Sequence, residues 1–121
     1  MTGHVRLDDL IQVCRSGDWV DDELLKEMLS LFIHENARRL DAARDAARLA
    51  DHTQLRGAIH AIKGSAALVG ADDLRQLASE LEQAVVNGIP LNLLAATEQL
   101  QQEFAAVVAT LYARYPELAP A

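Results

Sequence analysis

A histidine, a lysine and two glycines lie close together in the middle of the chain, at a spacing suited to nucleophilic chemistry. Residues 60–70 are His-Ala-Ile-Lys-Gly-Ser-Ala-Ala-Leu-Val-Gly, and Gly57 precedes the histidine by three residues. A neutral imidazole nitrogen is a nucleophile that can form covalent intermediates. Phosphoryl transfer chiefly needs positioning and positive charge near the phosphoryl oxygens. Lys63 follows His60 by one helical turn, so its ammonium group could reach a phosphoryl group carried there.

Helical periodicity predicts that His60 faces solvent. Apolar residues at core spacing form one stripe: Leu55, Ile59, Ile62, Ala66 and Val69. His60 lies about 140° from the centre of this stripe at 100° per residue. The residues on its side are Arg56, Gly57, Lys63, Gly64 and Ala67. Because a glycine inside a helix costs roughly 1 kcal/mol relative to alanine, we interpret Gly57 and Gly64 as room for another molecule to approach.

The composition indicates one acidic helical domain spanning residues 1–121. Half of the residues are hydrophobic but only 4% are aromatic, and the net charge is −7. The charge argues against a nucleic-acid partner and against an anionic membrane surface. The single cysteine, Cys14, excludes an internal disulfide, fits a reducing compartment and is expected to be buried. The chain has no apolar run of membrane-spanning length and no apolar signal segment, so we expect a cytoplasmic protein.

Turn and cap signals divide the chain into five expected helices. Residues 1–5 are expected to be a loose tail, followed by a short helix over 6–15 with an apolar side formed by Leu7, Leu10, Ile11 and Cys14. After a break at 16–18, a long helix is expected from Asp21 to Ala50, with the stripe Leu25, Leu29, Phe32, Asn36, Leu40, Ala43, Ala47 and Ala50. We see no strand pattern.

The remaining helices follow from similar signals. Asp51 is the expected N-cap of the helix with His60, which should end at Gly70. The next helix should start at Ala71 or Asp72 and reach Val86, with the stripe Leu74, Leu77, Leu81 and Val85. Pro90 is expected to start a last helix through about Tyr115, leaving 116–121 as a tail. The sequence therefore predicts an all-α fold, an antiparallel up-down four-helix bundle over residues 20–115 with an additional short N-terminal helix.

The segment resembles the histidine-containing phosphotransfer (HPt) domain of two-component phosphorelays over about residues 20–115. His60, Ile62, Lys63, Gly64, Ser65 and Gly70 fill the positions of the family pattern, and residues 77–82 match its downstream Leu-x-x-x-Leu-Glu run. The resemblance implies that His60 is phosphorylated on its ε nitrogen, that Lys63 neutralises the phosphoryl group and that Gly64 lets a receiver domain come close. It also implies that Glu82 hydrogen-bonds the other ring nitrogen of the histidine.

The stripe of the next helix supports this placement of Glu82, which flanks it. A carboxylate that accepts a hydrogen bond from Nδ1–H would leave Nε2 with the free lone pair. Gln83 is the alternative if the register differs by one residue.

The expected function is that of a phosphorelay intermediate rather than an enzyme. His60 would accept a phosphoryl group from a receiver aspartyl phosphate or a kinase, and would pass it to another receiver aspartate. The expected partners are response-regulator receiver domains, a hybrid histidine kinase or both, with the protein itself a monomer. No cofactor is expected in this chain, because the receiver would supply the Mg²⁺. The expected docking residues are Arg56, Gly57, Ala61, Gly64, Ala67 and Leu68.

Two other helical folds that use histidine fit the sequence less well, and one further function stays open. A histidine-kinase dimerisation helix usually has an acidic residue after its histidine, where this chain has Ala61. A di-metal bundle uses Glu-x-x-His pairs, and none of the four histidines has a glutamate three residues before it. The alternative that stays open is a non-phosphorylated helical adaptor that binds a signalling partner.

Overall fold

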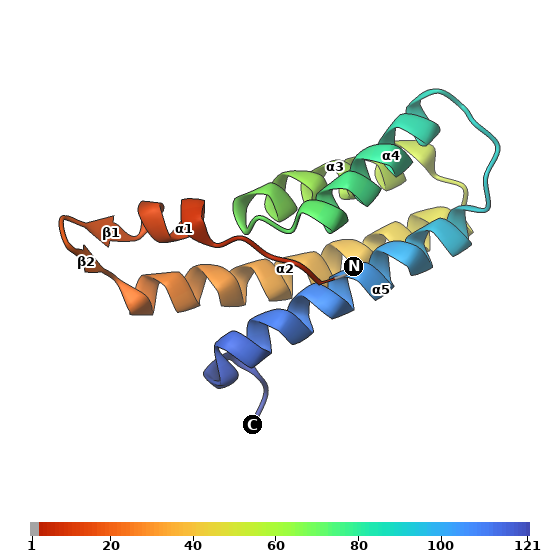
Figure 1. Cartoon of the computed structure of the whole chain (residues 1–121). Helices are drawn as coiled ribbons and strands as arrows, with labels where there is room; N and C mark the ends of the chain where they lie inside the picture. Colours follow the sequence, from red (N-terminus) through yellow and green to blue (C-terminus); the bar gives the residue numbers. More distant parts are fainter. Residues whose placement is uncertain (1–2) are drawn as a thin grey trace.

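The computed structural model describes residues 3–121, and four long antiparallel helices form most of it (Figure 1). They are α2 (Asp22–Arg48), α3 (His52–Leu68), α4 (Asp72–Val86) and α5 (Leu93–Arg114). α3 packs against α2 and α4, and α5 closes the bundle by packing against the same two helices. The predicted all-α up-down bundle is therefore confirmed. Within residues 3–121, no helix is long and apolar enough to cross a membrane.

Side-chain caps determine where three of these helices begin. The Asp21 carboxylate accepts from the backbone N–H of Leu24 at 3.0 Å, and Asp51 accepts from that of Gln54 at 3.1 Å. Asn92 caps α5 in the same way, accepting from Ala95 N–H at 3.1 Å. The predicted start of the last helix at Pro90 was wrong, because the asparagine side chain satisfies the first free N–H groups two residues later.

The core is a continuous apolar cluster to which all four long helices contribute. The whole predicted stripe of α3 is buried, with each member at most 2% exposed. The α2 stripe is also confirmed except at Ala50, since α2 ends at Arg48 and Ala50 is exposed with a φ of 52°. In α4, Leu74 and Leu81 are buried, while Leu77 and Val85 are half-buried against the core.

A short N-terminal helix covers one end of the bundle. α1 (Asp8–Val13) lies beyond the turn between α3 and α4, over the first turns of α2 (Figure 1). α2 has 27 residues and α3 has 17, so α2 extends about 15 Å further at 1.5 Å per residue. α1 covers this extension, and its Leu10 and the adjacent Cys14 are buried.

Two short segments differ from the sequence-based expectation of no strands. β1 (Arg15–Ser16) pairs antiparallel with β2 (Trp19–Val20), and Gly17 in the turn has a φ of 63°. A two-residue hairpin loop favours glycine at its first position because that residue needs a positive φ. The break expected at 16–18 is therefore a hairpin turn.

The ends of the chain pack more closely than predicted. Residues 1–2 lie outside the described part, but Gly3 and Val5 are buried rather than loose. The N–H of Gly3 donates to the buried carboxylate of Glu103 at 2.8 Å. At the other end, η1 (Pro116–Leu118) is a 3₁₀ turn whose Leu118 packs against the core.

Gly70 joins the N-terminal segment to the turn between α3 and α4. Its φ is 64°, and its carbonyl accepts a hydrogen bond of 3.0 Å from Arg6 N–H. A Cβ atom at this position would lie 2.1 Å from the Arg6 carbonyl oxygen. The Arg6 guanidinium also binds the Asp72 carboxylate at 2.8 and 2.9 Å, which lowers the pKa of Asp72. Gly70 is therefore required by the packing of this chain.

Gly70→Ala is expected to destabilise the protein by at least about 2 kcal/mol, because it adds both an overpacked contact and a strained φ. Gly88→Ala is the matched control, since Gly88 has a φ of 65° but open space around the position of a Cβ. It should cost only about 1 kcal/mol. Equilibrium denaturation of both variants measures the difference, and equal losses would contradict a role for the Arg6 contact.

Candidate functional site

His60 lies on the solvent side of α3, and its ring is held by a carboxylate from α4. Its side chain is 68% exposed, which confirms the orientation predicted from the helical periodicity. The Nδ1 atom lies 2.7 Å from Oε2 of Glu82. The expected contact therefore forms with Glu82 and not with its neighbour Gln83. An ionised carboxylate only accepts hydrogen bonds, so Nδ1 carries the proton and Nε2 keeps its lone pair.

Lys63 binds the same carboxylate. Its Nζ atom lies 2.6 Å from Oε1 of Glu82, whose side chain is only 12% exposed. The hydrogen bond from Lys63 lowers the pKa of Glu82, with a smaller contribution from the hydrogen bond to His60, while burial opposes the shift. Glu82 is therefore ionised at neutral pH and bridges two side chains of α3. The sequence predicted each residue but not the Lys63–Glu82 ion pair.

A hollow of about 510 Å³ lies beside the histidine ring. It is lined by Arg56, Gly57, His60, Lys63, Glu82, Gln83 and Val86. A Cβ atom at either Gly57 or Gly64 would meet nothing within 4 Å. Neither glycine is therefore explained by packing within this chain, in contrast to Gly70. Ala67 is exposed and Ala61 is half-buried, so the surface next to the ring carries little bulk.

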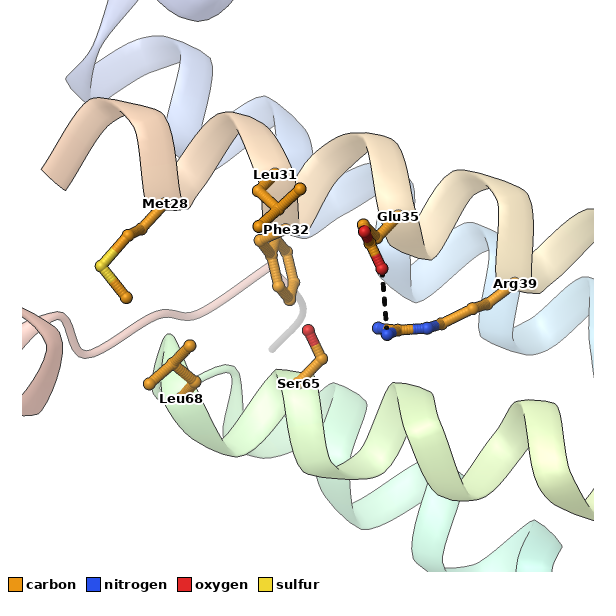
Figure 2. A pocket seen from close by; sticks show the side chains of 7 residues that line it. All are labelled: Met28, Leu31, Phe32, Glu35, Arg39, Ser65 and Leu68. Carbon is orange, nitrogen blue, oxygen red and sulfur yellow. Dashed lines mark hydrogen bonds and ion pairs between the residues drawn. The ribbon is translucent and has the colours of Figure 1, made fainter. Parts of the chain in front are cut away.

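A second hollow, of about 170 Å³, lies between α3 and α2 (Figure 2). Leu68 and Ser65 line it from α3, and Met28, Leu31, Phe32, Glu35 and Arg39 line it from α2. We call it the α2–α3 groove. Leu31 is 58% and Leu68 is 41% exposed, and a Glu35–Arg39 ion pair of 3.2 Å lies toward its other end. Leu68 was predicted from the sequence, but the α2 side of the groove was not. The available signal there was Leu31, a leucine outside the predicted stripe.

A buried amide fixes α3 against α2 near the site. Asn36 is fully buried, and its Nδ2 atom donates to the Phe32 carbonyl at 2.7 Å and to the Ser65 hydroxyl at 2.9 Å. Arg39 donates to the Asn36 Oδ1 atom at 3.2 Å. A buried polar group without partners is costly, so rotation of α3 that broke the link to Ser65 would be opposed. The link helps to keep Gly64 and His60 facing outward.

Glu82→Gln is expected to lower the free energy of unfolding by about 1 kcal/mol at neutral pH, because the amide cannot replace the charge that holds Lys63. Folding lowers the pKa of Glu82 below its ordinary value of 4.5. The stabilisation should therefore be complete above about pH 4.5 and be lost as the pH falls through the lowered value. Denaturation of both proteins over this range measures the gap between them.

Glu80→Gln is the control on the same helix, because the exposed Glu80 contacts Gln76 rather than a cation. It should change stability little at any pH. A gap between the unmodified protein and Glu82→Gln that stays constant into strong acid would contradict the ion pair.

Comparisons with known proteins identify the family of this fold. The chain matches the protein family described as Hpt domain over residues 27–114. The fold is similar to the crystal structure of histidine-containing phosphotransfer protein B (HptB) from Pseudomonas aeruginosa PAO1. That similarity has a TM-score of 0.74 and 26% sequence identity, and it covers 90% of this chain and 91% of the other. A search of curated proteins gave no significant match.

The family match spans most of α2 and the whole of α3, α4 and α5, and so includes both sides of the His60 site. The chain therefore belongs to the Hpt domain family, whose members carry phosphoryl groups in two-component signalling.

Proposed function

We propose that this domain accepts a phosphoryl group on Nε2 of His60 from a receiver aspartyl phosphate, or from a kinase, and passes it to another receiver aspartate. The observation that carries the proposal is the hydrogen bond of 2.7 Å between Nδ1 and Glu82, on a ring whose side chain is 68% exposed. That bond directs the lone pair to the nitrogen that faces away from the carboxylate. A buried histidine with the same partner could not reach an aspartate of another protein.

The division of labour follows from what the chain offers. His60 supplies the nucleophile, and Lys63 supplies positive charge one turn away on the same helix. The receiver would supply both the aspartate and the Mg²⁺ that neutralises the phosphoryl oxygens. This domain would bring no cofactor of its own and would have no autokinase activity. It acts as a carrier between active sites that belong to its partners.

The surface around His60 suits a partner that must come close. Gly57 and Gly64 leave open space that the fold does not need, and Ala67 continues the low surface along α3. We propose that a receiver seats its active site over these residues and rests an apolar patch on Leu68 and the α2–α3 groove. Arg56 lines the hollow by the ring and would contact acidic groups of the receiver. Such charges chiefly tune encounter rate and choice of partner.

His60→Gln is expected to abolish the transfer of labelled phosphate from a phosphorylated receiver domain, because the amide nitrogen is not a nucleophile. His34→Gln is the matched control, since His34 is an exposed histidine of α2 whose ring hydrogen-bonds Ser30 on its own helix. It should be labelled like the unmodified protein. Gel autoradiography after incubation with several receivers measures the label. Receiver binding without any labelling of the unmodified protein would instead favour the adaptor function.

Gly64→Gln is expected to reduce transfer at least about tenfold while raising the stability by roughly 0.5–1 kcal/mol, because glutamine favours a helix more than glycine does. Within residues 3–121, no atom beyond the adjoining backbone of α3 lies within 4 Å of the position of the new Cβ. Ala105→Gln places the same side chain at an exposed position on α5, which packs against α2 and α4, and should leave transfer unchanged. Thermal melts and transfer rates are measured together. Unchanged transfer in Gly64→Gln would refute close docking at this position.

A further inference from the structure

The single tryptophan of the chain is exposed at one end of the bundle. Trp19 lies in β2 and is 63% exposed. Val13 at the end of α1 is 61% exposed, and Leu24 in the first turn of α2 is 38% exposed. These elements are neighbours at one end of the molecule (Figure 1), and we call residues 8–24 the N-terminal module. Because tryptophan is enriched among the residues that dominate binding energy, its exposure beside two other apolar side chains indicates a protein-binding surface.

The fold braces the N-terminal module, so Trp19 is presented by an anchored hairpin. Leu10 and Cys14 are buried in the core on one side of the hairpin. On the other side, the Asp21 N–H donates to the Cys14 carbonyl at 2.8 Å, and the Asp21 carboxylate caps α2. A surface that is already ordered loses little freedom when it binds, which favours affinity.

The N-terminal module is distinct from the surfaces assigned to phosphotransfer. The match to the Hpt domain family begins at residue 27, after the module. His60 lies eight residues before the end of α3, about 12 Å, and α1 lies beyond that end (Figure 1). Leu24 precedes Leu31 of the α2–α3 groove by seven residues, about 10 Å. A partner on the module would therefore lie next to the groove and leave His60 open.

Negative charge is concentrated around these apolar side chains. Residues 8–27 contain seven acidic and two basic residues, so they carry five of the seven net negative charges of the chain. Within residues 3–121, none of the seven acids forms an ion pair, whereas Lys26 is bound by Glu117 at 3.1 Å. Clustered like charges repel one another, and a basic partner would relieve that repulsion. All of the acids except Asp21 are exposed: Asp8, Asp9, Asp18, Asp22, Glu23 and Glu27.

We propose that the N-terminal module binds a basic amphipathic helix of another protein, with Trp19 as the central anchor. The apolar side of that helix contacts Val13, Trp19 and Leu24, and its lysines or arginines meet the surrounding acids and the indole ring. The strands of the hairpin have two residues each, too short an edge for an added strand. A second copy of this chain, an anionic membrane or a nucleic acid would bring like charge to this end. The inference goes beyond the proposed function of His60 and does not depend on it.

The fluorescence of the full chain tests the surface directly, because its single tryptophan lies in the N-terminal module. The probe is a synthetic amphipathic peptide of leucine and lysine, about five helical turns long. Its addition should move the Trp19 emission to shorter wavelengths, as the peptide excludes water from the indole ring. Raising the salt concentration should weaken the binding, because the acids are exposed. The same peptide with glutamate in place of lysine should leave the emission unchanged.

Calorimetric titration of variants with the leucine–lysine peptide separates the apolar and the charged contributions. Trp19→Ala should weaken binding at least about tenfold. Leu49→Ala should not, since Leu49 is 79% exposed at the opposite end of α2, a helix about 40 Å long. Replacing Asp22 by Asn and Glu23 by Gln together should weaken binding about threefold to tenfold. The matched control replaces the exposed Asp41 by Asn and Glu98 by Gln, which removes the same net charge outside the module.

Amide NMR of the ¹⁵N-labelled full chain then locates the peptide. Shifts centred on residues 8–24 support the inference, and shifts centred on residues 56–64 would place the peptide on the His60 surface and overturn it. An unchanged Trp19 emission, equal binding of the glutamate peptide, or equal losses in the module variants and their controls would also overturn it. A Trp19→Ala variant that failed to fold would leave the fluorescence and NMR of the unmodified protein to decide. Phosphoryl transfer enters none of these measurements, so their failure leaves the proposed function of His60 untouched.

Discussion

The burial of one face of α3 between α2 and α4 is the constraint on which the rest of the structure depends. Four apolar side chains of this helix and its C-cap Val69 are almost fully buried, and burial of that size is the main favourable term that holds such a helix in a bundle. Because the stripe occupies one side, the opposite side must face solvent. His60, Gly57 and Gly64 lie on that side. The packing of the core thus decides the exposure of the nucleophile, and the site needs no loop to present it.

Much of the fold could be predicted from the sequence, because the signals for a helix lie in neighbouring residues. Stripes at a period of 3.6 residues, the acidic start at Asp21 and the cap at Asp51 placed α2 and α3 to within about two residues. The predictions were wrong where a contact distant in sequence buries a segment, or where a competing cap sets the start of a helix. Pro90 is a favourable first residue of a helix, but Asn92 supplies the cap. Residues 3–5 have no periodic signal, and the burial of Gly3 depends on partners such as Glu103, a hundred residues away.

The candidate site also has features that are local in sequence and features that depend on contacts between helices. The spacing of His60 and Lys63 on one helix is a local property, and so was visible in the sequence. The position of Glu82 was reached through a family resemblance together with the flank of the α4 stripe. Its simultaneous contact with both side chains of α3 depends on the rotation of two helices about their axes, which periodicity leaves uncertain by tens of degrees. The α2–α3 groove was missed for the same reason, because its two walls come from different helices that are distant in sequence.

The three consecutive residues Lys63, Gly64 and Ser65 have three different surroundings. Successive residues of a helix point about 100° apart, and α3 has a neighbouring helix on each side. Lys63 meets the carboxylate on α4, Gly64 meets open solvent, and Ser65 meets the buried amide on α2. The three residues of this turn therefore belong to three different surfaces of α3. Each of the three residues has a different neighbour, so a substitution at one of them leaves the contacts of the other two in place.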